Sequence, residues 1–261
     1  CCGLLCLWLW HFVAIAEILK EVEPATLKRI STAEGMSQGT INHFYQDDKG
    51  YVWLSTAEGL NLYNGYKVRP FLPDGFFESS YIEFVFQDKE GFFWISVSEQ
   101  GLFRFEAESG QLSKFWDATD TFVRDVMAWH MDSDGNTIWF FTTNAVLKYS
   151  FNTNEITEHL PQIPLFTEEQ YIWSVEKVDN FFWLGTNKGV FRYDPVEQSV
   201  LQFEIEDTNT AKANSERTNQ IRRITKDNSD NLWVATARGL FRLSSKQLDP
   251  QARDSSLNKI H

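Results

Sequence analysis

Apolar and polar residues alternate in four short runs between residues 41 and 71, which predicts four β-strands. The runs cover residues 41–46, 51–55, 60–63 and 66–71. Turn-forming residues separate them: two aspartates and a glycine follow the first run, Gly59 follows the second, and the hairpin signal Asn64–Gly65 follows the third. Four strands joined by such tight turns form one antiparallel sheet.

This arrangement recurs five times along the 261 residues. A tryptophan in the second strand marks each copy, at Trp53, Trp94, Trp139, Trp183 and Trp233. The spacing of 41 to 50 residues is the length of a four-stranded propeller blade. No stretch after Ala16 holds the 3.6-residue apolar stripe of a helix-rich domain. The sequence therefore predicts an all-β fold, a β-propeller with about five blades present.

The repeats place the blades at residues 35–74, 75–115, 116–165, 166–206 and 207–253, after a lead-in at 17–34 and before a tail at 254–261. Within the lead-in, residues 27–31 predict a lone strand of the kind that completes the last blade of a propeller and closes its ring. The chain after Leu243 shows little strand pattern, so the alternative is that the five blades are an open arc of a larger ring. The third copy departs most from the others, because Trp129–Met131 falls where its first turn is expected.

The residues that recur in every blade have structural duties. Tryptophan offers a large flat surface for packing between sheets, and glycine permits a positive φ or a close approach of backbones. We therefore do not interpret the repeated Trp, Gly and Asp positions as a catalytic set.

The first sixteen residues contain no Asp, Glu, Lys or Arg and end in the small residues Ala14 and Ala16. This pattern is typical of the hydrophobic region and cleavage site of a secretory signal peptide, and we expect the sequence to begin inside a longer gene product. Cleavage after Ala16 removes Cys1, Cys2 and Cys6, which are all the cysteines of the chain. The sequence also contains no Asn-x-Ser/Thr acceptor for N-glycosylation. Together with the loss of all cysteines on cleavage, this favours a bacterial periplasmic protein.

The net charge of −12 comes from acids spread along the whole chain. Such a surface repels phosphate backbones, so nucleic acid is not an expected partner. The charge pattern otherwise indicates only a solvated protein surface.

The repeat resembles the two-component regulator propeller, a family of bacterial sensor repeats. The first copy carries the resemblance through residues 41–47 together with Gly50, Trp53, Thr56, Gly59, Leu60 and Tyr63. Residues 183–193 and 233–242 repeat the same motif of tryptophan, threonine, glycine and arginine. The resemblance covers residues 25 to about 243.

The resemblance implies that the chain is the extracytoplasmic sensor part of a membrane receptor whose output module is a histidine kinase or a diguanylate cyclase. It also implies seven blades in a ring, a homodimeric receptor, and attachment to the membrane through segments C-terminal to this sequence. We therefore expect an N-terminal fragment of a sensor that carries no catalytic module of its own and needs no cofactor.

Two neighbouring positions in the first strand of each blade break the repeat. They lie between two apolar columns, which we assign to the core: Ile41, Ile82, Val123, Ile172 and Ile221 in one, and Phe44, Val85, Val126, Val175 and Ile224 in the other. The variable positions are Asn42 and His43, Glu83 and Phe84, Arg124 and Asp125, Trp173 and Ser174, and Arg222 and Arg223.

Inner strands line the central channel of a propeller, where ligands commonly bind. We predict a ligand site made by Asn42, His43, Glu83, Arg124, Asp125, Trp173, Arg222 and Arg223. A small molecule or glycan suits this set, with Trp173 as a stacking face and Asn42 or an arginine as hydrogen-bond donor. The alternative is that these side chains simply face water in the channel.

Other chemistry has weaker support. Residues 132–139 resemble part of a calcium loop and also the Asp-box turn of sialidase propellers, but they lack a distal bidentate glutamate, which favours a plain turn. His43, His130 and His159 lie in separate repeats without the spacing of zinc ligands. A secreted lyase or glycosidase with His43 or His130 as its base remains the alternative function, and a passive interaction scaffold is a third.

Overall fold

The computed structural model describes residues 28–117, 126–132, 135–142, 146–159, 171–203, 220–244 and 258–259. The chain divides into two compact units, residues 1–30 and 31–261, and all the described strands belong to the second unit. The predicted signal peptide at residues 1–16 lies outside the described residues. Within the described ranges, no helix is long and apolar enough to cross a membrane.

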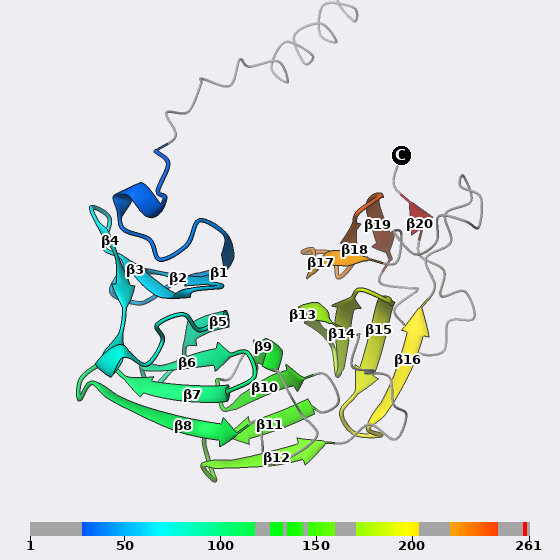
Figure 1. The fold of residues 1–261 in the computed structure, drawn as a ribbon. Helices are drawn as coiled ribbons and strands as arrows, with labels where there is room; N and C mark the ends of the chain where they lie inside the picture. The colour runs from blue at the N-terminus through cyan, green and yellow to red at the C-terminus, as the bar shows by residue number, and fades with distance from the viewer. Residues whose placement is uncertain are drawn as a thin grey trace, which may run out of the picture. The chain divides into compact units, whose positions relative to one another are not determined.

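The described strands form five four-stranded antiparallel sheets, which follow one another in chain order (Figure 1). Blade one contains β1 (Ile41–Gln46), β2 (Val52–Thr56), β3 (Gly59–Tyr63) and β4 (Val68–Phe71). Blade two contains β5 (Ile82–Gln87), β6 (Phe92–Val97), β7 (Gly101–Glu106) and β8 (Gln111–Asp117). Blade three contains β9 (Val126–Met131), β10 (Thr137–Thr142), β11 (Val146–Ser150) and β12 (Glu155–His159).

Blade four contains β13 (Ile172–Val178), β14 (Phe181–Thr186), β15 (Gly189–Asp194) and β16 (Ser199–Phe203). Blade five contains β17 (Ile221–Lys226), β18 (Leu232–Thr236), β19 (Gly239–Leu243) and the short β20 (Asn258–Lys259). Two short 3-10 helices, Thr32–Glu34 and Pro73–Gly75, complete the described regular structure.

The blades pack side by side through their first strands. β1 contacts β5, β5 contacts β9, β9 contacts β13, and β13 contacts β17. A β-propeller is built in this way, from radially repeated sheets whose first strands face a common axis. The all-β propeller predicted from the sequence is therefore confirmed.

Each pair of neighbouring blades shares its own hydrophobic core, and there are four such cores within the described residues. Trp53 and Phe93 meet between blades one and two, with ring centroids 4.5 Å apart. Trp94 and Phe140 meet between blades two and three at 5.2 Å. The strand alternation explains this division, because successive side chains of one sheet point to opposite neighbours. No blade buries its apolar faces alone.

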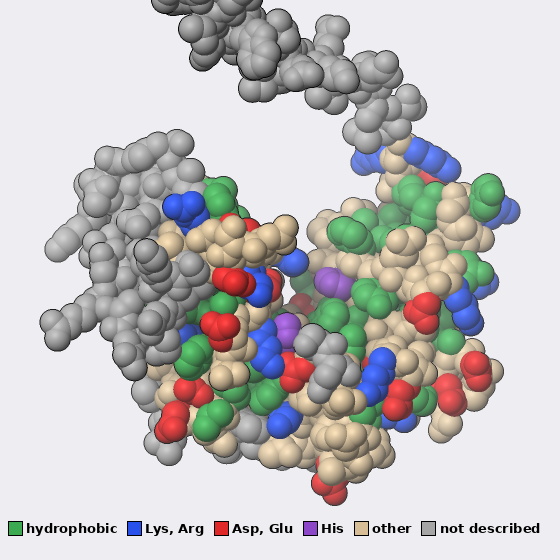
Figure 2. Space-filling view, turned by 180° about the vertical axis from the view of Figure 1, so that it is seen from behind, with side chains coloured by type: hydrophobic (Ala, Val, Ile, Leu, Met, Phe, Trp, Pro, Cys, Tyr) green, Lys and Arg blue, Asp and Glu red, His purple; other side chains and the backbone are tan. Residues whose placement is uncertain are grey.

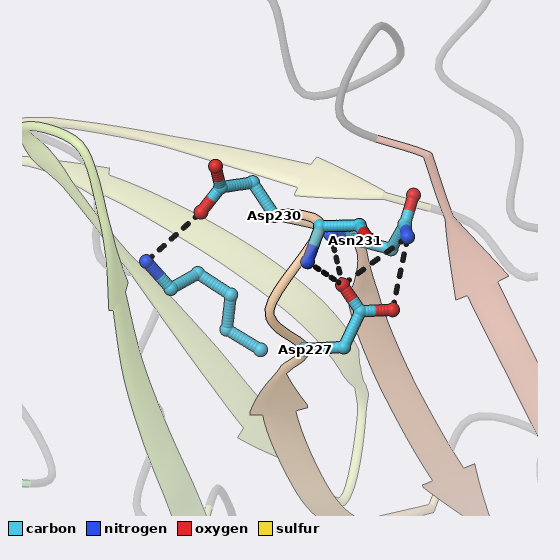
Figure 3. A network of polar contacts seen from close by, with 5 residues as sticks. Asp227, Asp230 and Asn231 are labelled. Atoms are coloured by element: carbon cyan, nitrogen blue, oxygen red, sulfur yellow. Dashed lines mark hydrogen bonds and ion pairs between the residues drawn. The ribbon is translucent and has the colours of Figure 1, made fainter.

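The repeated aspartate holds the turn between the first and second strands. In blade five, Asp227 Oδ1 accepts hydrogen bonds from the backbone amides of Ser229 and Asn231 at 2.8 and 2.9 Å (Figure 3). Its Oδ2 accepts a hydrogen bond from Trp233 Nε1 at 2.7 Å. The corresponding carboxylate-to-indole bonds in blades one, two and three measure 2.8, 2.7 and 3.2 Å. The carboxylate thus satisfies buried donors, as the structural interpretation of these columns predicts.

The structure corrects two expectations, one about blade three and one about blade one. Trp129–Met131 does not interrupt a turn but continues strand β9. Ile41 and Phe44, assigned to the core columns, are 43% and 70% exposed. This face of blade one is uncovered because no blade packs against it within the described residues.

The ends of the unit also differ from the sequence pattern. Residues 28–31 are not in a strand, and the 3-10 helix Thr32–Glu34 follows them, capped by the Ser31 side chain. Ring closure by the lead-in stays a prediction. β20 lies within the segment predicted as a tail and pairs with β19 through Phe241 and Arg242. A strand of two residues has no alternation for a sequence pattern to reveal.

Candidate functional site

The first strand of every blade carries an irregularity at the same place. In blade one, Ile41 pairs with Thr56 and His43 pairs with Ser55, which leaves Asn42 without an opposite residue. The same shift occurs in the other four blades. The residues at this bulge are Asn42, Glu83, Met127, Trp173 and Arg222. Such bulges bend a strand and redirect a side chain, and they are common next to binding sites.

A cavity of about 990 Å³ lies along these strands. The bulge residues of blades one to four line it, and so do the residues that follow the bulge in all five blades: His43, Phe84, Ala128, Ser174 and Arg223. Figure 2 shows a hollow at the centre of one face, with histidine side chains visible inside it. The break in the repeat therefore coincides with this cavity.

The structure brings together five of the eight residues predicted for the site: Asn42, His43, Glu83, Trp173 and Arg223 all line the cavity. Arg222 does not line it, but its guanidinium lies 4.7 Å from the centroid of the Trp173 ring. Arg124 and Asp125 lie outside the described residues.

The strand register assigns different residues to the third blade. Val126 pairs with Thr142 as Ile41 pairs with Thr56, so Val126 takes the column position expected for Val123. Met127 and Ala128 then take the variable positions expected for Arg124 and Asp125. Val126 lies thirteen residues before Trp139, close to the twelve that separate Ile41 from Trp53, whereas Val123 lies sixteen before it. The remaining difference of one residue is the turn, where Trp139 lies seven residues after its aspartate instead of six.

Two tyrosines of the cavity escaped the sequence pattern. Tyr81 and Tyr171 directly precede the first apolar column in blades two and four, and they are 44% and 48% exposed. Their carbonyl oxygens accept backbone hydrogen bonds from Ser98 and Asn187, which fixes both at the same end of their strands. Together with Trp173, which is 38% exposed, they give the cavity a set of accessible aromatic faces. The sequence feature that could have identified these tyrosines is their position directly before the first apolar column.

His43 is a neutral group inside the cavity. Its Nδ1 atom is buried and has no hydrogen-bond partner, and its ring packs edge-on against Phe84 at 6.5 Å. Burial, reinforced by the positive charge of Arg223, lowers its pKa from 6.5 to about 4. The cavity wall therefore holds a neutral imidazole with one buried, unsatisfied ring nitrogen.

The lowered pKa of His43 predicts a pH dependence of stability. In the unfolded chain His43 binds a proton below about pH 6.5, whereas in the folded chain it does so only near pH 4. Between these values the unfolded state binds more protons than the folded state. The contribution of His43 to the free energy of unfolding is therefore greatest above about pH 6.5 and is lost as the pH falls towards 4. Denaturant titrations at pH 7 and pH 5 measure this loss. His43→Phe should reduce the difference between the free energies of unfolding at these two pH values. An unchanged difference would contradict the assignment of the effect to His43.

A second half-buried histidine, His130, lies on the inner strand β9. His130 lines the cavity, its ring packs edge-on against Phe182 at 5.5 Å, and burial lowers its pKa. Asp132 lies near it and accepts hydrogen bonds from Trp139 Nε1 and from Lys177 of blade four. These are the bonds of a strand-connecting turn with a cross-link to the next blade. Within the described ranges, no group of three His, Cys, Asp or Glu residues is placed to hold a metal ion.

The fold and its central cavity define a β-propeller with a concave site on its axis. Residues 35–58 match the family model of the two component regulator propeller, which confirms the resemblance seen in the first repeat. No curated protein matches the sequence.

Several solved structures share the fold. The extracellular domain of the putative hybrid two component system BT3049 from B. thetaiotaomicron matches with a TM-score of 0.68 and 21% identity, over 85% of this chain and 31% of its own length. That of the putative one component system BT4673 from the same organism matches with a TM-score of 0.58 and 18% identity, over 84% of this chain and 28% of its own.

PorZ, a surface component of the type-IX secretion system of Porphyromonas gingivalis, matches with a TM-score of 0.53 and 15% identity, over 77% and 32% of the two chains. At these identities the likeness shows the fold. The chain spans about a third of the length of the solved structures it matches. It is a propeller whose fold resembles the extracellular domains of these putative signalling systems.

Proposed function

We propose that this propeller is a ligand-sensing domain of a bacterial membrane receptor, facing the periplasm or the cell exterior. The observation that carries the proposal is the central cavity, which gathers the positions where the five repeats differ. A regular ring needs no such variety, whereas an asymmetric ligand needs different groups around one mouth. The likeness to extracellular domains of two-component systems supports the receptor context.

The lining favours a saccharide as the ligand. Tyr81, Tyr171 and Trp173 offer apolar ring faces, which stack on the C–H faces of sugars. Asn42, Glu83 and Arg223 place amide, carboxylate and guanidinium groups within the same lining, and these suit hydroxyl groups. Aromatic faces beside mixed polar groups are the common composition of small-molecule sites.

The rest of the proposed receptor follows from the resemblance. The full protein is a homodimer attached to the membrane outside this sequence, and ligand binding changes the relation between its protomers. The propeller itself performs no catalysis, and the output is a histidine kinase or a diguanylate cyclase. Sequencing the gene beyond residue 261 tests this context: a membrane span followed by either module supports it, and a stop codon contradicts it.

Binding of defined oligosaccharides to the chain tests the site. Neutral and uronic-acid-containing oligosaccharides are titrated by isothermal calorimetry into the wild type and into Trp173→Ala and Arg223→Ala. Loss of a stacking face or of a charged hydrogen bond is expected to weaken binding at least about tenfold. The melting temperature should hardly change, because Trp173 and Arg223 belong to no interblade core.

Leu201→Ala serves as the control, because Leu201 is 48% exposed on β16 and does not line the cavity. It should bind like the wild type. If no oligosaccharide binds, the saccharide assignment is wrong. If both cavity variants bind normally, the site lies elsewhere.

A second candidate function is a polysaccharide lyase or glycosidase, which one observation favours. His43 is neutral at physiological pH and lies in the same cavity as Arg223, so a base and a cation converge on one mouth. Incubation of the chain with the oligosaccharides that bind it separates the two functions. Release of new reducing ends or of unsaturated products, lost in His43→Phe, would establish the enzyme.

A further inference from the structure

In four of the five blades, the side chain of an arginine or lysine packs against an aromatic ring. The third strand places it opposite the repeated tryptophan: Arg104 pairs with Trp94, Lys148 with Trp139, Arg192 with Trp183, and Arg242 with Trp233. Arg104 lies 4.1 Å from the centroid of the Phe92 ring, and Arg192 lies 4.6 Å from that of Phe181. Lys148 and Arg242 lie 5.2 and 5.9 Å from the rings of their tryptophans. These distances are those of cation–π contacts.

Blade one keeps the aromatic rings of this arrangement but lacks the cation. Trp53 pairs with Leu62, which therefore occupies the position of the arginine or lysine. Tyr51 precedes Trp53 by two residues, as Phe92 and Phe181 precede their tryptophans. Phe71 pairs with Leu60 as Phe203 pairs with Val190, and Phe203 is one of the rings that Arg192 approaches in blade four.

The structure has a cavity at this point, between blades one and two. Its volume is about 510 Å³, and Leu62, Tyr51, Trp53 and Phe71 all line it. Tyr51 is 39% exposed. The ring of Phe71 contacts those of Trp53 and Phe105 at centroid distances of 4.8 and 5.0 Å, so the aromatic wall is continuous across the two blades. The rings are thus held in place by one another; Lys49 lines the same cavity and Arg69 of β4 pairs with Leu62, but neither makes a cation–π contact to these rings among the contacts of the described residues.

The rim of this cavity is acidic. Its lining contains four exposed or half-buried carboxylates and two lysines: Asp48, Glu90, Glu106 and Glu108, with Lys49 and Lys89. Asp47 also lines the cavity, but it is buried and its oxygens accept the hydrogen bonds of the blade-one turn. Lys89 is directed to blade three, because its Nζ donates a 2.5 Å hydrogen bond to Asn136 and lies 4.8 Å from the Phe151 ring. Lys49 offsets part of the remaining charge, which stays negative and favours a positive ligand.

We propose that this cavity binds the guanidinium group of an organic cation, in the place that an arginine side chain holds in the other blades. Three of the four resident cations are arginines, so the geometry of the aromatic wall suits a planar guanidinium. The rim carboxylates supply acceptors for its N–H groups. This site is separate from the central cavity and does not depend on the proposed function.

The test compares a guanidinium with its neutral isostere. Butylguanidinium and butylurea are titrated at low millimolar concentration into the chain, with binding followed by ligand-observed NMR. Butylguanidinium should bind, and butylurea should bind at least about tenfold more weakly. A short peptide with one arginine, titrated in parallel, identifies the source: tighter binding of the peptide indicates an arginine side chain of a protein, and equal binding indicates a free small molecule.

Leu62→Arg supplies the missing cation from within the chain and should weaken butylguanidinium binding at least about tenfold while the melt stays cooperative. Val196→Arg adds the same charge at an 80% exposed position in blade four and should bind like the wild type. If Leu62→Arg fails to fold, Glu106→Gln gives a second readout, with about threefold weaker binding expected. Equal binding of butylurea, or equal weakening by Leu62→Arg and Val196→Arg, would overturn the proposal.

Discussion

Replacing Trp183 with alanine is expected to lower the free energy of unfolding by about 3–5 kcal/mol. The Trp183 side chain is 1% exposed and belongs to the core between blades four and five, together with Val190 and Ile224. Its ring packs against Phe203 with centroids 4.9 Å apart. Truncation leaves a cavity that surrounding strands fill poorly, because the sheets on both sides fix their positions.

Denaturant unfolding followed by circular dichroism measures this loss. Trp173→Ala is the matched control, since it removes the same side chain from a position that is 38% exposed. That variant should lose far less stability than Trp183→Ala. Similar losses in both variants would show that the repeated tryptophans are not the packing elements of the blades.

Gly185→Val is expected to destabilise the contact between blades four and five by about 1–3 kcal/mol or more. A Cβ atom at Gly185 would lie 2.7 Å from Ile221 Cγ2 and 3.1 Å from Ile224 Cγ1. Both isoleucines belong to β17, so the absence of a side chain at Gly185 lets the fifth blade approach the fourth. The cause is steric contact between blades, since β14 is an ordinary strand at this residue.

The comparison with Gly39→Val isolates that cause. A Cβ atom at Gly39 would have nothing within 4 Å, so the same substitution there should leave the melting temperature nearly unchanged. Hydrogen exchange adds a local measurement: amides of β17 and β18 should lose protection in Gly185→Val before those of blade two do. Uniform loss of protection would contradict an effect confined to one blade contact.

The sequence predicts the fold well because the blade is a local unit. Strand alternation, the turn aspartate and the buried tryptophan all lie within about fifteen residues of one another, and the pairs Asp88–Trp94 and Asp227–Trp233 form the bonds that such a unit needs. Burial depends on more than local pattern. Phe44 has the apolar character of a core residue, yet it is 70% exposed because its burial requires a neighbouring blade.

The site is predicted only in part, for two physical reasons. Val123 and Val126 have the three-residue spacing of the two apolar columns, but the strand register places Val126 in the first column, which brings Met127 to the place expected for Arg124. The tyrosines Tyr81 and Tyr171 lie outside the two variable positions, although they project from the same strand ends. The residues that line a cavity depend on where each strand begins in space. The spacing of apolar residues along the chain does not by itself determine that position.

The bulge at the start of each inner strand separates the side chains of the proposed ligand site from the residues that form the strand ladder. Asn42, Glu83, Met127, Trp173 and Arg222 occupy ladder positions with no opposite residue, and these five side chains already range from amide to indole. Substitution at these positions leaves strand pairing intact, because the flanking residues carry the ladder. A library randomised at Glu83, Trp173 and Arg222 should therefore yield folded variants with new binding preferences. Asn42 and Met127 are left unchanged in it, because their side chains hydrogen-bond to the next blade.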